Sequence, residues 1–145
     1  MSVKTMAELM AEGKEAEILF WVGSAGSFDD RAKKITRAFV KIMNSAGVNF
    51  GVLGTEESSS GDAAKRAGNE FLFQMQAMTN IQVMNGYNVK HIVTTCPHSY
   101  NTLKNEYPSL GGNYKVKHHT EYITELIADG KLKVVSNLEG TKVTY

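Results

Sequence analysis

Four short polar segments lie where predicted β-strands end, and they hold most of the side chains suited to chemistry. These segments are Gly23-Ser24-Ala25-Gly26, Glu57-Ser58-Ser59-Ser60-Gly61-Asp62, Cys96-Pro97-His98-Ser99 and His118-His119. Open α/β sheets form their ligand sites at the carboxyl ends of the strands. We therefore predict that the four segments converge on one pocket, although they are far apart in the sequence.

The first segment follows a strand and opens a helix, as phosphate-binding turns do. It departs from the dinucleotide fingerprint, because the third glycine is missing and the first gap is two residues instead of one. It also lacks a Walker lysine. A plain capped turn and a nucleotide site both remain open, and the capped turn explains more of the residues.

Cys96 permits two kinds of thiol chemistry. A thiol phosphatase needs an arginine to close the loop around phosphate, and residues 97–102 contain none. Acyl transfer needs a base, but Cys96 and His98 are two residues apart at a helix start and point apart. His118 or His119 would have to be that base, with no identifiable acid to orient it.

A zinc site is the fourth alternative, because Cys96, His98, His118 and His119 are all possible zinc ligands. Their spacing matches no recognised zinc finger. A buried, inert cysteine is also more common than a catalytic one. The residues by themselves therefore leave several kinds of site open.

Strand and helix alternate along the chain. The pattern predicts strands at 17–22, 48–53, 91–95 and 114–117, with extended segments at 132–135 and 142–145. Helices are predicted at 6–11, 27–46, 62–85, 97–107 and 120–128. The fold class is α/β: a mostly parallel sheet of four to five strands with helices on both faces, layered as in Rossmann and flavodoxin folds.

Local signals set the ends of several helices. Thr5 and Glu8 predict a capping box, Ser27 an N-cap, and Pro97 the first turn of a helix. Gly68 lies inside the predicted helix 62–85 and suggests close packing there. The residues of that helix expected to face the core are Ala64, Ala67, Phe71, Leu72, Met75, Met78 and Ile81.

Composition bounds the function. The chain has 145 residues, 42% of them apolar, and a net charge of +1, which gives no electrostatic case for nucleic acid. Its longest apolar run, Ile18–Val22, is too short to insert directly into a membrane. A single cysteine makes no internal disulfide. We expect one cytoplasmic domain, and the final residues read as an unfinished strand, so we expect a fragment of a longer protein.

Three segments carry a family resemblance: Trp21–Ala32, Glu56–Glu70 and Thr94–Pro108. They resemble the cysteine-rich (CCG) domain of heterodisulfide-reductase-like and glycolate-oxidase-type iron–sulfur oxidoreductases. The resemblance covers nearly the whole chain, because long strings agree in order and spacing. It implies an electron-transfer oxidoreductase with an iron–sulfur cluster of the 4Fe-4S type.

The family motif is one cysteine, a long gap, a cysteine pair, another long gap and then C-x-x-C. The resemblance places these iron ligand positions at Ser24, at Ser59 with Ser60, at Cys96 and at Ser99, with gaps of 34 and 35 residues. Only Cys96 is a cysteine. Clusters need soft thiolates, so one thiol and several hydroxyls cannot hold one. The resemblance also implies that three glycines let the backbone approach a cluster: Gly23, Gly26 and Gly61.

Two explanations account for the serines: cysteines exchanged for serine in an expressed fragment, or a natural homologue that has lost its cluster. In either case we expect no cluster in this chain. The implied partners are the rest of the parent chain, with a second cysteine-rich repeat and a ferredoxin-like segment, or redox subunits. The parent would be cytoplasmic or at the inner face of the cytoplasmic membrane. The alternative function is a non-catalytic interaction domain.

Overall fold

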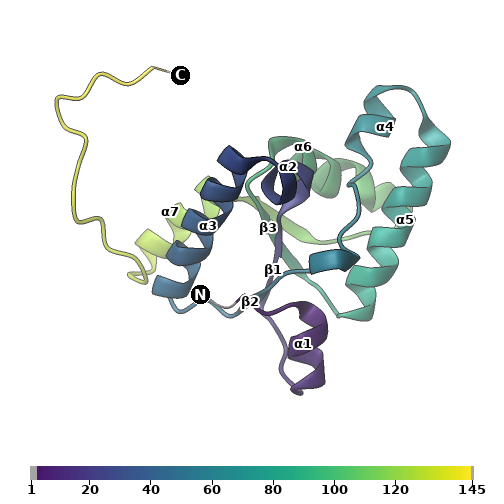
Figure 1. The fold of residues 1–145 in the computed structure, drawn as a ribbon, viewed down its shortest axis with the longest axis horizontal. Helices are drawn as coiled ribbons and strands as arrows, with labels where there is room; N and C mark the ends of the chain where they lie inside the picture. The colour runs from purple at the N-terminus through teal and green to yellow at the C-terminus, as the bar shows by residue number, and fades with distance from the viewer. Residues whose placement is uncertain (1–2, 145) are drawn as a thin grey trace.

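The computed structural model describes residues 3–144 as a parallel sheet between two layers of helices (Figure 1). The strands are β1 (Ile18–Trp21), β2 (Phe50–Gly51), β3 (His91–Thr94) and β4 (Lys115–His118). They pair in the order β2-β1-β3-β4, and every pair is parallel. The α/β class and the parallel sheet predicted from the sequence are thus confirmed.

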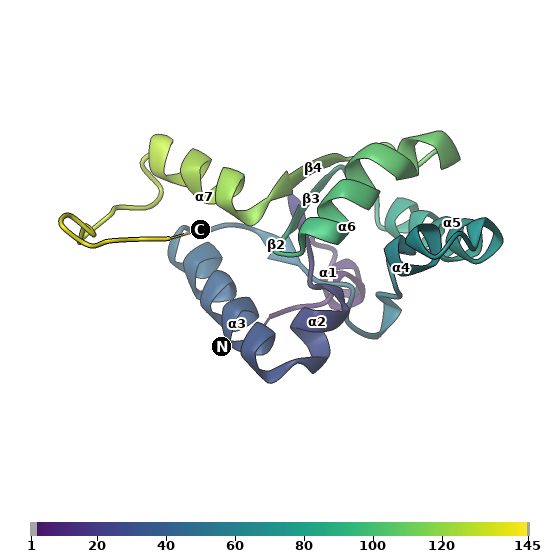
Figure 2. The same cartoon turned by 90° about the horizontal axis from the view of Figure 1, so that it is seen from above.

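Helices cover both faces of this sheet (Figure 2). On one face, Phe20 and Val93 pack with Phe39 and Met43 of α3 (Asp30–Ser45), and α7 (His119–Ala128) closes the edge. On the other face, the core contains Trp21 and the inner sides of three α-helices. These helices are α1 (Met6–Ala11), α4 (Asp62–Arg66) and α5 (Glu70–Gly86). Neighbouring strand residues alternate between the two cores, as parallel strands buried on both faces must.

The helix after β3 is less regular than predicted. Its α-helical part is α6 (Pro97–Asn101), with Pro97 in the first turn as expected. The chain continues as a π-helical turn, Thr102–Glu106, and a 3₁₀ turn, Tyr107–Leu110. Pro108 therefore does not stop the helical path. That path ends at Gly111, which has a φ of +88°.

The predicted helix 62–85 is two helices. α4 ends at Arg66, and Asn69 caps α5 by accepting a hydrogen bond from Leu72 N at 3.1 Å. Gly68 between them has a φ of +79°, and a Cβ there would meet nothing within 4 Å. The expected close packing at Gly68 is therefore wrong, because the glycine serves a turn that favours a left-handed conformation.

The predicted core face of α5 is also largely wrong. Ala64 of α4 and Ile81 of α5 are buried as expected, but Ala67 is exposed, and the outward face of α5 exposes Phe71, Leu72, Met75 and Met78. The inward face carries Phe73, Ala77, Asn80, Ile81 and Met84. Apolar residues occupy both sides of this helix, so their spacing alone did not identify the buried side.

Other local expectations divide in the same way. The Thr5–Glu8 capping box is present. Ser27 does not cap α3, because it lies inside the short helix α2 (Gly23–Phe28) and Asp29 is the cap. Residues 132–135 and 142–144 form no strand, and Tyr145 lies outside the described residues. Within 3–144, none of the helices combines the length and the apolar character that a membrane span requires.

Candidate functional site

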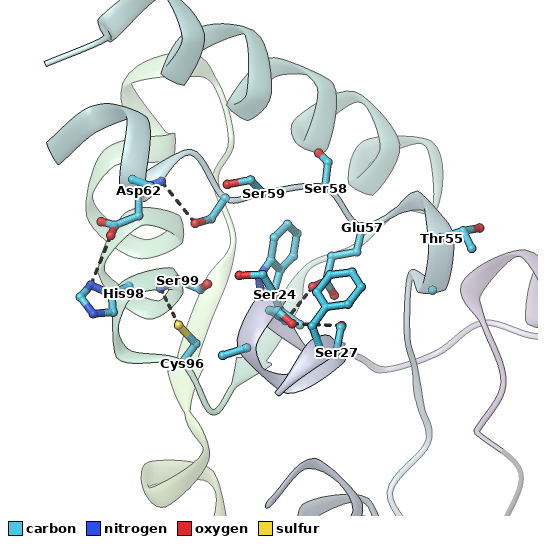
Figure 3. A pocket seen from close by; sticks show the side chains of 17 residues that line it. Ser24, Ser27, Thr55, Glu57, Ser58, Ser59, Asp62, Cys96, His98 and Ser99 are labelled. Carbon is cyan, nitrogen blue, oxygen red and sulfur yellow. Dashed lines mark hydrogen bonds and ion pairs between the residues drawn. The ribbon is translucent and has the colours of Figure 1, made fainter. Parts of the chain in front are cut away.

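A pocket of about 770 Å³ opens at the carboxyl edge of the sheet (Figure 3). Three segments form its walls: the start of α2 after β1, the loop before α4, and the turn from β3 into α6. We call residues 22–28, 57–62 and 96–102 the first, second and third walls. The first and third walls follow the ends of β1 and β3 directly. The second wall follows β2 through a short 3₁₀ turn, Gly54–Glu56.

Most of the predicted site residues line this pocket. They are Gly23, Ser24, Ser59, Ser60, Cys96 and Ser99. His118 and His119 do not join them. His118 Nδ1 lies 2.8 Å from Thr120 Oγ1, and the ring of His119 packs edge-on against Phe39. The expectation that all four polar segments converge is therefore wrong for the histidine pair, and the acyl-transfer base and zinc ligands it would supply lie elsewhere.

The three predicted glycines have different roles. A Cβ on Gly23 would lie 3.6 Å from Cys96 Cβ, so this glycine brings the first wall against the third. A Cβ on Gly26 would lie 2.9 Å from Thr36 Oγ1, and one on Gly61 would lie 2.7 Å from Phe73 Cδ2. The structure thus explains Gly26 and Gly61 by packing within the protein.

Cys96 sits at the junction of β3 and α6. Its backbone N–H donates to Thr94 Oγ1 at 3.2 Å, and its Sγ accepts from Ser99 N at 3.5 Å. Cys96 is half-buried, and Ser99 beneath it is buried. The first turn of α6 therefore holds positions 96 and 99 side by side on the third wall.

Two fully buried side chains hold the second wall from below. Asn80 accepts from Ser58 Oγ at 2.8 Å and donates Nδ2 to Ser59 O at 2.8 Å. It also donates to the hydroxyl of Tyr107, which in turn donates to Ser60 O at 2.9 Å. Burial raises the pKa of Tyr107 above its usual value, so the hydroxyl stays protonated and keeps donating.

Glu57 connects the second wall to the first. Its Oε1 accepts from Gly23 N at 2.6 Å, and its Oε2 accepts from Val22 N at 3.0 Å. Burial raises the pKa of this carboxyl, and the two backbone N–H groups oppose that effect in part. Both of its oxygens are therefore occupied by the backbone that leads into position 24.

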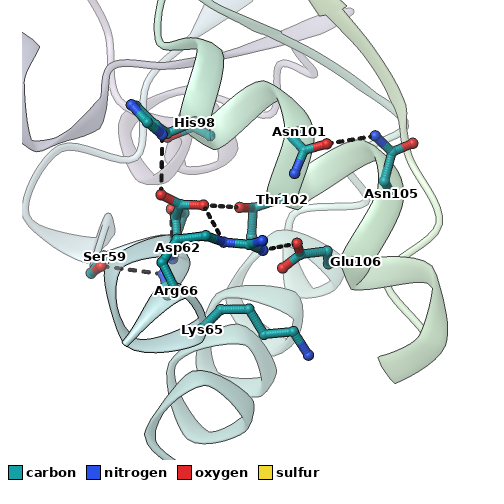
Figure 4. A network of polar contacts seen from close by, with 12 residues as sticks. Ser59, Asp62, Lys65, Arg66, His98, Asn101, Thr102, Asn105 and Glu106 are labelled. Carbon is teal, nitrogen blue, oxygen red and sulfur yellow. Dashed lines mark hydrogen bonds and ion pairs between the residues drawn. The ribbon is translucent and has the colours of Figure 1, made fainter. Parts of the chain in front are cut away.

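Asp62 connects the second wall to the third (Figure 4). Its Oδ1 accepts from Thr102 Oγ1 at 3.2 Å, and its Oδ2 pairs with His98 Nδ1 at 3.2 Å. Arg66 Nε lies 3.4 Å from the same carboxylate, and Arg66 also pairs with Glu106. The side chain of Asp62 is only 16% exposed, so these partners replace most of its water.

Sequence reasoning placed Glu57 and Asp62 in the pocket, at the two ends of the serine-rich loop, but gave them no role. It missed Trp21, which lines the pocket at the end of β1. Trp21 is buried, and its Nε1 has no hydrogen-bond partner among residues 3–144. No sequence signal marked that indole, because Trp21 reads as an ordinary core residue of β1.

Comparison with known proteins agrees with this geometry. Residues 18–104, which contain all three walls, match the family model of the cysteine-rich domain, CCG. The chain belongs to the cysteine-rich domain family. No solved structure matches it.

This cysteine-rich domain has relatives among iron–sulfur oxidoreductases. It is 51% identical over 144 residues to the EtfAB:quinone oxidoreductase of Syntrophomonas wolfei, with 99% of the chain and 20% of that protein covered. It is 52% identical over 131 residues to the probable iron-sulfur-binding oxidoreductase FadF of Bacillus subtilis, with 90% of the chain and 19% of that protein covered.

A more distant relative is a component of the dihydromethanophenazine:CoB–CoM heterodisulfide reductase of Methanosarcina mazei. It is 26% identical over 137 residues, with 90% of the chain and 33% of that relative covered. The cysteine-rich domain spans about a fifth of the length of the first two relatives.

The donor atoms of this cysteine-rich domain do not fit an iron–sulfur cluster. Within residues 3–144, no three side chains of His, Cys, Asp or Glu gather as a metal site. Cys96 is the sole thiol of the chain, and serine oxygens are hard ligands, whereas iron–sulfur clusters are held mainly by soft thiolates.

Proposed function

We propose that this cysteine-rich domain is the cluster-cradling part of an iron–sulfur electron-transfer oxidoreductase of the heterodisulfide-reductase-like class. The iron ligand positions would be 24, 59, 96 and 99, with 60 as the second member of the pair. One observation carries the proposal: these positions line a single pocket at the sheet edge. A 4Fe-4S cluster, when bound, accepts and releases one electron at a time.

As it stands, the chain lacks the thiols for such a group, so we propose that it holds no cluster and has no redox turnover. Its partners would be the remainder of the parent chain, with a second cysteine-rich repeat and a ferredoxin-like segment, or redox subunits. Relatives about five times as long support that view. We place the parent in the cytoplasm, or at the inner face of the cytoplasmic membrane.

Restoring the thiols tests the proposal. The triple variant Ser24→Cys, Ser59→Cys, Ser99→Cys, reconstituted with iron and sulfide without oxygen, should turn brown and absorb in the visible region. The matched control places three cysteines outside the pocket, as Ser45→Cys, Ser109→Cys and Ser136→Cys. The same treatment should leave this control and the unmutated chain colourless. A colourless pocket variant would contradict the proposal.

One observation favours the alternative function, a non-catalytic interaction domain. The outward face of α5 exposes Phe71, Met75 and Met78 at helical spacing, on the side opposite Asn80. Exposed apolar faces of this kind mark surfaces for protein partners. If the variant with restored thiols remains colourless, the alternative function stands, and the exposed face of α5 is where a protein partner would bind.

A further inference from the structure

Side chains join the second wall of the pocket to the other two walls. Among the described residues, no backbone–backbone hydrogen bond joins one wall to another. The first and third walls follow β1 and β3, which pair directly up to Trp21 and Thr94, so the sheet holds these two walls together. The second wall is anchored from below by Asn80 and Tyr107. Its spacing from the other two walls must therefore depend on contacts made by side chains.

Two carboxylates supply those contacts from opposite ends of the second wall. Glu57 takes both of its hydrogen bonds from the first wall, and Asp62 bonds Thr102 and pairs with His98 of the third wall. In residues 3–144 these four contacts are every hydrogen bond and ion pair that links the second wall to the other two. The second wall is therefore the central part of the pocket.

We propose that Glu57 and Asp62 are positioning residues that set the spacing of the pocket before anything binds in it. Glu57 fixes position 24, because it holds the amides of Val22 and Gly23 immediately before it. Asp62 fixes positions 96 and 99, because it holds His98 and Thr102 on the same turns of helix. This inference rests on the proposed function for the identity of the positioned ligands.

The first experiment uses the chain as it stands and follows its single thiol. Gly23 packs against Cys96, so loss of the Glu57 bonds should uncover the sulfur. Glutamine keeps the shape of Glu57 but places an NH₂ donor against a backbone N–H. We expect Glu57→Gln and Asp62→Asn each to raise the alkylation rate of Cys96 several-fold. The rate is compared at the high-pH plateau, where every thiol is ionised and its pKa no longer matters.

Glu56→Gln is the matched control. Glu56 is the neighbouring residue, but its carboxylate accepts from the exposed Tyr87 hydroxyl at 2.6 Å. The plateau alkylation rate of Glu56→Gln should equal that of the unmutated chain. Far-UV circular dichroism checks that each variant is folded. Should Asp62→Asn fail to fold, Thr102→Val removes one donor to Asp62 without changing the volume of the side chain. Unchanged plateau rates in Glu57→Gln and in Asp62→Asn, or in Thr102→Val where it replaces Asp62→Asn, would overturn the inference.

The second experiment asks which ligand position each carboxylate controls, with Co²⁺ as the probe. In the four-thiol chain (Ser24→Cys, Ser59→Cys, Ser99→Cys), both Glu57→Gln and Asp62→Asn should weaken Co²⁺ binding by about 10-fold or more, as loss of outer-shell partners does. In a three-thiol chain that keeps Ser24, Glu57→Gln should have no effect on Co²⁺ affinity, whereas Asp62→Asn should still weaken it.

The outcomes separate the two proposals. If the four-thiol chain binds no Co²⁺ while the plateau rates rise, the ligand assignment fails and the positioning role stands. If Co²⁺ binds equally well in all variants and the plateau rates are unchanged, the positioning role fails and the cradle stands. Equal losses from Glu57→Gln in the three-thiol and four-thiol chains would overturn the assignment of Glu57 to position 24.

Discussion

His119 is a half-buried residue at the start of α7, and its ring packs edge-on against Phe39 with centroids 5.7 Å apart. Its Nδ1 is buried and has no partner among the described residues. Burial lowers the pKa of this imidazole below the usual 6.5, and the neighbouring His118 lowers it further. Protonation of His119 is therefore unfavourable in the folded state.

This arrangement predicts a pH dependence of stability. Between the lowered folded pKa and 6.5, the unfolded chain binds more protons, so the free energy of unfolding falls as the pH is lowered through that window. His119→Phe keeps the aromatic packing and removes the titration. Urea unfolding at pH 7.5 and 5.5 should show a smaller pH effect in the variant, by about 0.5 kcal/mol or less, since the ring is partly solvated. An unchanged pH effect would contradict this role.

Among the helices, α5 shows the limit of reading a buried face from apolar spacing. Its inward side includes the polar Asn80, whose amide makes three hydrogen bonds. A buried amide is stable there only because these partners replace water. Sequence periodicity could not reveal this, since the partners Ser58, Ser59 and Tyr107 lie at least 21 residues away along the chain.

Two phenylalanines of α5 test this assignment. Phe73 is 1% exposed and Phe71 is 75% exposed, although they are two residues apart. Phe73→Ala should lower the free energy of unfolding by about 3–5 kcal/mol, because it leaves a cavity in the core. Phe71→Ala, the matched control, should change it by about 0.5 kcal/mol or less. Chemical denaturation measures both, and equal losses would show that the buried face is misassigned.

Helix ends were predictable where the signal was local and strong. The Thr5–Glu8 capping box and Pro97 are examples, since each depends on residues within one turn. The break between α4 and α5 had a comparable signal, a glycine followed by a capping Asn69. The sequence analysis did not predict this break, because apolar residues continue both before Gly68 and after Asn69.

At the scale of the whole molecule, the parallel sheet was predictable from the sequence, whereas the contacts that shape the pocket were not. Alternating strands and helices were enough to predict a parallel sheet with polar loops at one edge. The roles of Glu57 and Asp62 could not be predicted, because their partners are 34 to 40 residues distant. Two histidines were wrongly placed in the pocket because β4 is at the sheet edge, beyond β3.

The C-terminal segment contributes little to this fold. Residues 133–144 are exposed and form no helix or strand, and in Figure 1 they extend away from the sheet. Truncation after Leu132 should therefore change the free energy of unfolding by about 0.5 kcal/mol or less. Truncation before His119 removes Tyr122 and Ile123 from the core beside Phe39 and should be strongly destabilising. Thermal melts of both truncations measure the difference, and equal melting temperatures would contradict it.

The central place of β1 has a consequence for synthesis on the ribosome. Leu19 pairs with Ile92, roughly seventy residues later, so β1 leaves the exit tunnel well before its neighbour β3 is made. At about 5–20 residues per second, that wait lasts several seconds. During this time β1 can pair with β2 and pack against α3, but its other edge still lacks its partner strand. We expect β1 to be the main point of contact for chaperones that bind emerging polypeptides.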